Sequence, residues 1–366
     1  MANNSDLNNA GRAKKDEFYT QLPDIEEEMK HYRKHFKGKT VLCNCDDPFE
    51  SNFFRYFALN FNRLGLKKLV ATCYSGSSIT GTQLSLFGDG DEERRTPYKA
   101  VVSSVRDANG DGATNMLDIE ELFRTGENSI ERLDGNGDFR SRECLDLLDQ
   151  ADIVATNPPF SQFRDYIKTL VEHDKKFIII GNINAITCKE IFPLFMENKV
   201  WLGASIHSGD RAFFVPDDYP LNGSNCGIDD SGRKFIRVKG VRWFSNLDYR
   251  QRHEELILVR KYNPDDYPTY GNYDAIEVSK TGDIPYDYDG VMGVPITFLD
   301  KYNPDQFEIL GMTDRNNPFG LTTRIFTKDE TPNASDLNRR GAIWTGTEWK
   351  STYARILIRN RNPEEA

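Results

Sequence analysis

An apolar run rich in β-branched residues, followed by a run with helical spacing, recurs along the first two thirds of the 366-residue chain. It begins at residues 39–47, KTVLCNCDD, and continues into 51–65, where phenylalanines recur at helical spacing behind Ser51, an expected helix N-cap. A second apolar run, LKKLVATCY, follows at 66–74. The last copy is a complete strand-helix-strand unit made of ADIVATN (151–157), SQFRDYIKTLVEHD (161–174) and KFIIIGNINAI (176–186). This alternation predicts parallel strands in an α/β sheet covered by helices.

Two polar segments follow strands of this predicted sheet. Asn157, Pro158, Pro159 and Phe160 come directly after one strand, and Asp46 and Asp47 follow another. Ligands of open α/β sheets bind at the carboxyl ends of strands, so we expect both segments at the same edge. The alternatives are a proline-rich turn without function for the first segment and a helix N-cap for the aspartate pair.

The types of residue in the NPPF segment suit chemistry on an amine. The side-chain oxygen of Asn157 and the carbonyl of Pro158 can accept hydrogen bonds from an exocyclic amino group, and Phe160 can stack on the ring that carries it. Two acceptors would direct the nitrogen lone pair toward a methyl donor for direct displacement. Such a step needs no unusual general base, and no His or Cys nucleophile is evident nearby.

The order of these motifs resembles the S-adenosylmethionine-dependent N6-adenine DNA methyltransferases, and more narrowly the EcoRI-type adenine-specific enzymes. The resemblance is carried by DEFYT (16–20), CDDPFESNFFRYF (45–57), GDF (137–139), ADIVATNPPFSQFRDYI (151–167) and VRWFSNL (241–247). It implies a Rossmann-like methyltransferase sheet with helices on both faces and a smaller β-rich C-terminal domain. It also implies S-adenosylmethionine as cofactor and a site-specific DNA adenine N6-methyltransferase as the activity.

The same resemblance implies roles for individual residues. Phe18, Tyr19 and Thr20 would line the methionine end of the cofactor, Asp46 and Asp47 would lie under its amino group and ribose, and Asp138 and Phe139 would hold its adenine. One feature departs from the family: typical members carry a glycine-rich F-x-G-x-G loop after the first strand, where this chain has CNCDDPFES. In that loop, side chains must approach the cofactor where other members use bare backbone.

A duplex hides the adenine amino group, so the target base must be flipped out and stacked between apolar side chains. Phe160 supplies one wall of the pocket. The opposite wall is expected from Phe213 or Phe214, or from Trp243 and Phe244, and for each pair the alternative is a core position. An RNA base or a protein glutamine is the alternative substrate for the same NPPF site, and a catalytically silent nucleic-acid-binding relative is a further alternative.

Basic and aromatic residues are interleaved between Ser231 and Lys261, where nine Lys or Arg oppose three Asp or Glu. The net charge of the whole chain is −10, which argues against indiscriminate binding of nucleic acid and favours local contacts. The predicted DNA contacts are Arg233, Lys234, Arg237, Lys239, Arg242, Trp243, Phe244, Arg250 and Arg252. The alternative is a solvated hairpin face.

Composition and spacing set the remaining expectations. We expect a methyltransferase domain at 1–260 with a polar insertion, mainly loops with one short helix, at about 75–135, and a target-recognition domain at 261–366 that is rich in Tyr, Asn, Pro and Gly. The partner is double-stranded DNA, any cognate restriction endonuclease is a separate chain, and the enzyme is expected to be a monomer. No apolar run approaches the ~18 residues of a membrane span, and the cysteines lack zinc spacing, which together predict a cytoplasmic protein without structural zinc.

Two segments have a spacing that resembles a metal site, but neither has a full set of ligands. DANGDGATNMLD (107–118) has EF-hand spacing, but its twelfth position is Asp118 instead of Glu, its eighth is Thr114 and a strand-like run precedes it, which favours an Asx-rich turn over calcium. His31 and His35 lie one helical turn apart without a third ligand, as on an exposed helix face. No metal ligand is therefore assigned.

Overall fold

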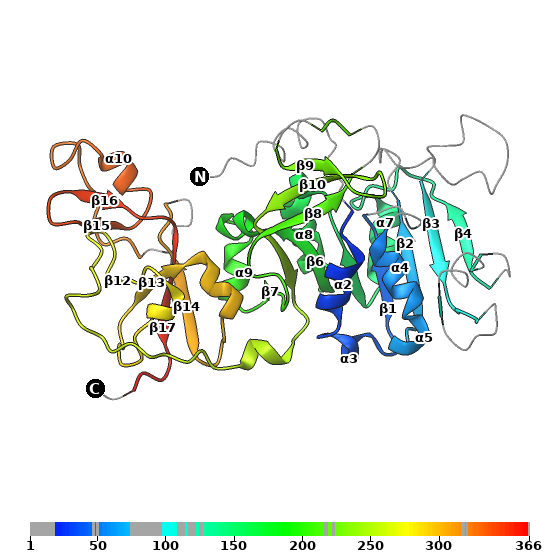
Figure 1. Ribbon diagram of the computed structural model, residues 1–366, viewed down its shortest axis with the longest axis horizontal. Helices are drawn as coiled ribbons and strands as arrows, with labels where there is room; N and C mark the ends of the chain where they lie inside the picture. Colours follow the sequence, from blue (N-terminus) through cyan, green and yellow to red (C-terminus); the bar gives the residue numbers. More distant parts are fainter. Residues whose placement is uncertain are drawn as a thin grey trace. The chain divides into compact units, whose positions relative to one another are not determined.

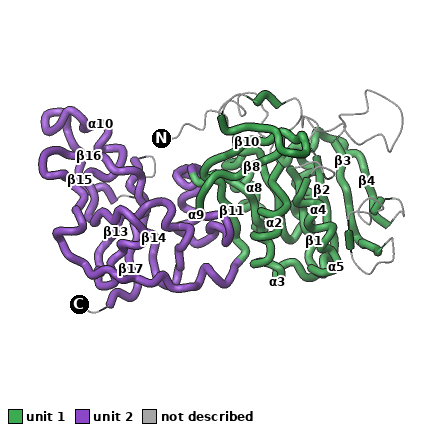
Figure 2. The backbone as a smooth tube through the Cα atoms, in the orientation of Figure 1, with its two compact units in different colours: residues 1–183, 208–247 green, residues 184–207, 248–366 purple. Residues whose placement is uncertain are grey.

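The computed structural model describes residues 19–45, 48, 51–73, 97–107, 114–115, 122–123, 127–215, 219–221, 224–315, 319 and 321–364. The chain forms two compact units, one of residues 1–183 with 208–247 and the other of residues 184–207 with 248–366 (Figure 2). The second unit therefore begins at 248 and also takes in a segment between two strands of the first, which differs from the predicted boundary at 260.

Unit 1 is built on a mixed sheet in which its strands lie in the order β4-β3-β2-β1-β5-β6-β11 (Figure 1). Strands β2, β1, β5 and β6 are parallel to one another, whereas β3, β4 and β11 run antiparallel to their neighbours. The strands are β1 (Thr40–Cys43), β2 (Lys68–Thr72), β3 (Tyr98–Val102), β4 (Ser129–Arg132), β5 (Ile153–Thr156), β6 (Lys176–Asn182) and β11 (Val241–Ser245). The predicted α/β sheet is confirmed.

The helices of unit 1 form where the sequence has apolar residues at helical spacing. Ser51 caps α4 as predicted, because its hydroxyl accepts from the backbone N–H groups of Phe53 and Phe54. The elements are α2 (Leu22–Met29), α3 (Arg33–Phe36), α4 (Asn52–Leu59), α5 (Phe61–Leu64), α7 (Arg142–Gln150), the 3₁₀ turn η3 (Phe160–Gln162) and α8 (Phe163–Glu172).

Helices cover both faces of this sheet, and two neighbouring residues of β11 show it. Trp243 packs edge-on against Phe53 of α4, with ring centroids 5.8 Å apart. Phe244 packs against Phe163 of α8 at 4.9 Å. Because successive side chains of a strand point to opposite faces, α4 and α8 lie on opposite faces.

The region predicted as a polar insertion, about 75–135, contributes more than loops where it is described. Its strands β3 and β4 pair with each other and extend the main sheet beyond β2. A separate antiparallel sheet of unit 1, β8-β10-β9, follows β6 in the chain and consists of β8 (Asp210–Phe214), β9 (Cys226–Ile228) and β10 (Lys234–Lys239). In Figure 1 this small sheet lies at the edge of unit 1 opposite α3, the helix that leads into β1.

Unit 2 contains a four-stranded sheet in the order β12-β13-β17-β14 and a two-stranded hairpin, β15-β16. Its strands are β7 (Trp201–Leu202), β12 (Ile276–Glu277), β13 (Met292–Pro295), β14 (Phe307–Met312), β15 (Ala342–Trp344), β16 (Trp349–Ser351) and β17 (Arg355–Asn360). The short helices are α9 (Phe192–Met196), η5 (Arg250–His253), η6 (Thr281–Asp283), η7 (Ile296–Lys301) and α10 (Ala334–Leu337), and η4 (Ile183–Thr187) leads into the unit. None of the helices in the described ranges is long and apolar enough to cross a bilayer.

Candidate active site at the carboxyl ends of β1 and β5

The strand order of unit 1 changes direction between β1 and β5. The chain passes from β1 outward to β2 on one side, and from β5 outward to β6 on the other. The two strands are parallel neighbours, with Val41 opposite Ile153 and Leu42 opposite Val154. Ligands of open α/β sheets bind at such a switch point, outside the carboxyl ends of the strands. Asn44 directly follows β1 there, and Asn157 directly follows β5.

The NPPF segment forms the turn between β5 and α8. Asn157 is 4% exposed and Pro158 is buried, whereas Pro159 and Phe160 are partly exposed. The carbonyl of Pro159 accepts from the N–H of Gln162 at 2.9 Å, which starts η3. Two consecutive prolines restrict the backbone of this turn, so the polar groups of Asn157 and Pro158 are held in place before a ligand arrives.

Strand β8 brings an aromatic ring to this turn. The rings of Phe213 and Phe160 meet edge-on, with centroids 6.1 Å apart and an angle of 85° between their planes. Phe213 is 1% exposed. Phe214 points to the other side of β8, where the guanidinium carbon of Arg233 lies 3.9 Å from its ring centroid. Of the two predicted wall residues on β8, the structure places Phe213 beside Phe160.

The predicted cofactor residues Tyr19 and Thr20 lie between β8 and α4. Tyr19 exchanges two backbone hydrogen bonds with Phe214, of 2.9 and 3.1 Å. The carbonyl of Thr20 accepts from Nδ2 of Asn52, the first residue of α4, at 2.8 Å. These contacts connect the start of the chain to the strand that touches Phe160. Phe18, Asp46 and Asp47 lie outside the described residues.

The predicted adenine-binding residues Asp138 and Phe139 follow a glycine with positive φ. Gly137 has φ +75°, and a Cβ built on it would lie 2.1 Å from the backbone oxygen of Cys73, the residue after β2. Phe139 is 7% exposed. Hydrogen bonds from Arg140 hold the pKa of the Asp138 carboxyl below its usual value, so this side chain is an anion at neutral pH.

Sequence reasoning missed Tyr166 of α8, which joins two of these loops. Its hydroxyl donates to Oδ1 of Asn44, and its ring packs edge-on against Phe139 with centroids 5.0 Å apart. Burial raises the pKa of Tyr166 well above its usual value, so the hydroxyl stays protonated. The available signal was a hydroxyl on the otherwise apolar face of α8, where Phe163, Ile167 and Leu170 are buried.

Buried polar atoms on both sides of β1 fit a polar ligand at this edge. Thr72 ends β2 and Thr156 ends β5, and the Oγ1 atom of each is buried without a hydrogen-bond partner among the described residues. Buried polar atoms in native proteins are normally satisfied by protein, water or ligand. A ligand that carries several donors and acceptors, such as a nucleoside joined to an amino acid, therefore suits the carboxyl ends of these strands.

The structure divides the predicted DNA-contacting residues into buried and accessible groups. Trp243 and Phe244 are 0% exposed in the core between α4 and α8, so they cannot reach DNA or a flipped base in this structure. Arg242 is 3% exposed and donates to the carbonyl of Val241. Arg252, in unit 2, is 6% exposed and stacks on Trp201, with its guanidinium carbon 3.9 Å from the ring centroid. Their predicted role in DNA binding is not supported.

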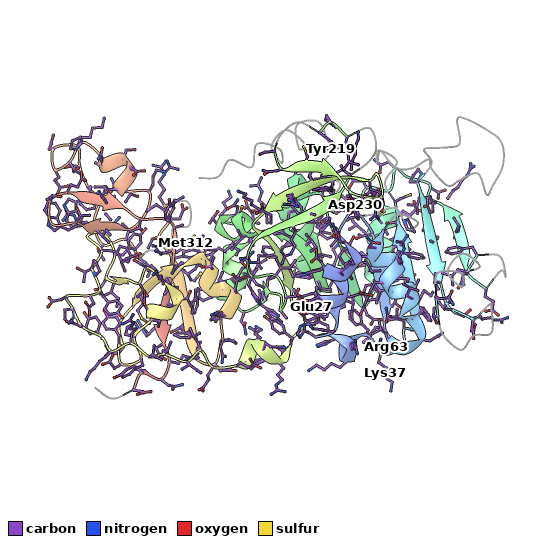
Figure 3. All side chains as sticks on the ribbon, in the orientation of Figure 1. Glu27, Lys37, Arg63, Tyr219, Asp230 and Met312 are labelled. Carbon is purple, nitrogen blue, oxygen red and sulfur yellow. The ribbon has the colours of Figure 1, made fainter. Side chains whose placement is uncertain are left out.

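The other predicted cations remain accessible. In unit 1, Arg237 and Lys239 are exposed on β10, Arg233 pairs with Asp229 at 3.0 Å, and Lys234 donates to the carbonyl of Tyr219 at 3.2 Å. Figure 3 labels Tyr219 beside the small sheet, at the edge of unit 1 opposite Lys37. Arg250, in unit 2, has an almost fully exposed side chain.

No group of three or more His, Cys, Asp or Glu side chains is placed to hold a metal ion in the part of the chain that the structure describes. Most of the loop with EF-hand spacing, including Asp111 and Asp118, lies outside that part.

Known proteins resemble this chain over most of its length. The profile of the family "Adenine-specific methyltransferase EcoRI" matches residues 6–361. The chain is 48% identical over 311 residues to the Type II methyltransferase M.EcoRI of Escherichia coli, which covers 84% of this chain and 89% of the relative. It is 36% identical over 359 residues to the Type II methyltransferase M.MpnI of Mycoplasma pneumoniae, which covers 97% and 98% of the two chains. No solved structure matches it. With an NPPF turn at the switch point of its sheet and a family match over nearly its whole length, the chain belongs to the EcoRI family of adenine-specific methyltransferases.

Proposed function

We propose that this enzyme transfers a methyl group from S-adenosylmethionine to N6 of an adenine flipped out of a specific site in duplex DNA. Methylation of adenine in DNA is the activity of its family. The observation that carries the mechanism is the NPPF turn beside the switch point between β1 and β5, in which Asn157 and Pro158 are buried. When bound, S-adenosylmethionine supplies a methyl group on a sulfonium, a leaving group that departs as a neutral thioether.

Asn157 and Pro158 orient the amine. The Asn157 side-chain oxygen and the Pro158 carbonyl each accept one N6 hydrogen, so the nitrogen lone pair is directed along the line of attack. S-adenosylmethionine would supply the methyl group and keep the electron pair of its sulfur–carbon bond, while the nitrogen held by Asn157 and Pro158 would form the new N6–C bond. One N6 proton then leaves to solvent. Because both acceptors are buried, water does not compete for the amino group.

Phe160 and Phe213 form one side of the base pocket. The partly exposed ring of Phe160 stacks on the flipped adenine, and the ring of the buried Phe213 packs against Phe160 at a steep angle. Tyr19, Thr20, Asp138 and Phe139 then border the cofactor, as the resemblance implies, together with Phe18, Asp46 and Asp47.

Cations outside the pocket contact the DNA backbone. Arg233, Lys234, Arg237 and Lys239 of unit 1 lie on or beside β10, in the sheet whose β8 touches the NPPF turn, and Arg250 lies in unit 2. Phosphate contacts of this kind position a protein without reading sequence. We assign the reading of bases mainly to residues 261–366. The enzyme acts as a cytoplasmic monomer, and any cognate restriction endonuclease is a separate chain.

The test is transfer of tritiated methyl from S-adenosylmethionine to duplex DNA, with separation of the product nucleosides. Wild type should label N6-methyladenine, and Asn157→Ala should lose at least about a hundredfold in rate while it still binds the cofactor. Asn62→Ala is a control, because Asn62 is an exposed asparagine of α5 whose Nδ2 donates to the Val105 carbonyl at 2.9 Å.

Two further methyl acceptors distinguish DNA from the alternative substrates. Structured RNA and a glutamine-containing peptide are offered under the same conditions. Label on either one, with none on duplex DNA, would overturn the proposal.

A further inference from the structure

Tyr166 makes a buried hydrogen bond to the residue that follows β1. The side chain is 1% exposed, so its hydroxyl depends on a partner within the protein. It donates to Oδ1 of Asn44, which lies far from it in the sequence. The bond therefore joins α8, the helix that follows the NPPF turn, to the loop at the carboxyl end of β1.

This bond fixes the orientation of the Asn44 amide. Oδ1 faces Tyr166 and also lies 3.7 Å from the thiol of Cys45, so the amide NH₂ points away from both. Asn44 is 6% exposed, and in the ranges that the structure describes its side-chain hydrogen bonds engage Oδ1. The Nδ2 donor is therefore available to a ligand or water at the carboxyl end of β1.

The position of Asn44 at the edge of the sheet favours a bound ligand as the acceptor for its Nδ2. Asn44 follows β1 at the switch point, between the strands that end in Thr72 and Thr156. The ring of Tyr166 also contacts Phe139, which follows the anionic Asp138. One side chain of α8 thus touches both loops that border the proposed cofactor, and the same helix starts at the catalytic turn.

We propose that Asn44 binds the methyl donor, with its Nδ2 donating to a carboxylate oxygen of S-adenosylmethionine, and that Tyr166 is the positioning residue that holds this amide in the binding orientation. The inference rests on the proposed function. It adds one cofactor-binding residue at the position where typical members carry a glycine-rich loop. The Asn44 side chain would donate to the cofactor in place of the backbone N–H groups of that loop.

The substitution Asn44→Asp separates cofactor binding from structural support. An aspartate keeps an oxygen that accepts from Tyr166, so the link between α8 and β1 survives. It replaces the NH₂ donor by a second acceptor, which would repel a ligand carboxylate. A binding role therefore predicts loss of cofactor affinity with a folded protein, whereas a supporting role predicts little change in affinity.

The measurement is calorimetric titration of the full chain with S-adenosylmethionine and with S-adenosylhomocysteine, in the absence of DNA. We expect Asn44→Asp to weaken both dissociation constants by at least about tenfold, and Tyr166→Phe to weaken them by about three- to tenfold, because it loses one hydrogen bond. In methyl transfer, both variants should raise KM for the cofactor more than they lower kcat.

A control variant removes a similar bond elsewhere in unit 1. The hydroxyl of the fully buried Tyr32 donates to Glu28 at 2.8 Å, near the start of β1. Tyr32→Phe should destabilise the fold and leave the dissociation constants within about twofold of wild type. The inference is overturned if Asn44→Asp binds both compounds within twofold of wild type. If instead wild type binds neither compound, it is the proposed function that fails.

Discussion

Gly137 provides the sharpest test of how the GDF loop, residues 137–139, is built. Its φ of +75° is unfavourable for any residue with a Cβ, and that Cβ would lie 2.1 Å from the Cys73 oxygen and 3.1 Å from Cβ of Pro97. Ordinary contacts begin near about 3.4 Å, so Gly137→Ala must move the loop by about 1 Å. The atom in the way is a backbone oxygen at the end of β2, which cannot swing aside as a flexible side chain can.

The expected stability loss has two parts. The left-handed backbone conformation costs an alanine about 1–2 kcal/mol. Overpacking against the Cys73 carbonyl adds about 1–3 kcal/mol, for a total of about 2–5 kcal/mol. Displacement of Asp138 and Phe139 by about 1 Å should also weaken cofactor binding by at least about tenfold.

Gly38→Ala is the matched control. Gly38 has a similar φ of +71°, but nothing lies within 4 Å of its built Cβ. It follows Lys37, which Figure 3 labels at the edge of unit 1 opposite Tyr219. Gly38→Ala should lower the free energy of unfolding only by the conformational part, about 1–2 kcal/mol, and should bind the cofactor as wild type does.

Both variants are measured by urea unfolding and by cofactor titration. If Gly137→Ala matched Gly38→Ala in stability and in affinity, the close approach between the GDF loop and β2 would not exist as described. If it lost stability alone, Asp138 and Phe139 would not be cofactor residues.

Two further predictions concern unit 2. Arg355→Met should cost about 3–5 kcal/mol in the free energy of unfolding measured in urea, because it leaves the buried Glu277 carboxylate without the guanidinium that lies 2.5 Å away. Hydrogen bonds to Asp305 and Asp248 raise the pKa of His253, so the stability from its protonation is present below about pH 6.5 and is lost as pH rises through the raised folded value. The melting temperature of wild type should therefore fall across that window, and His253→Gln should remove this part of the fall.

The controls use residues of the same type. Arg359→Met removes an exposed arginine of β17 and should change the free energy of unfolding by less than about 0.5 kcal/mol. An equal loss in Arg359→Met and Arg355→Met would contradict the buried-pair argument. A pH slope in His253→Gln equal to that of wild type would show that another group is responsible.

The local elements of unit 1 were predictable because their signals are local. The spacing of Phe53, Phe54 and Phe57 marks an apolar helix face, and Ser51 can cap it with its own hydroxyl. The apolar runs that became β1, β2, β5 and β6 are short and β-branched, and the NPPF turn follows β5 as expected. The order of motifs was also sufficient to recognise the family.

Residues of β11 and η5 show where local patterns fail. The run VRWFS places a basic residue beside two aromatic ones, which resembles a nucleic-acid surface, yet helices cover both faces of β11 and bury Trp243 and Phe244. Arg252 resembles a phosphate contact in sequence but stacks on Trp201. Whether a side chain meets DNA or core depends on what packs against its strand, and that partner lies elsewhere in the chain.

The chemistry proposed for the NPPF turn could be inferred from sequence, because Asn157, Pro158, Pro159 and Phe160 are adjacent in the chain. The surroundings of that turn required tertiary structure. Phe213 of β8 contacts Phe160, and Tyr19, near the start of the chain, pairs with the same strand. Tyr166 of α8 donates to Asn44, which follows β1. These contacts join residues distant in sequence, and their free energy comes from packing and hydrogen bonds that form only when the sheet is assembled.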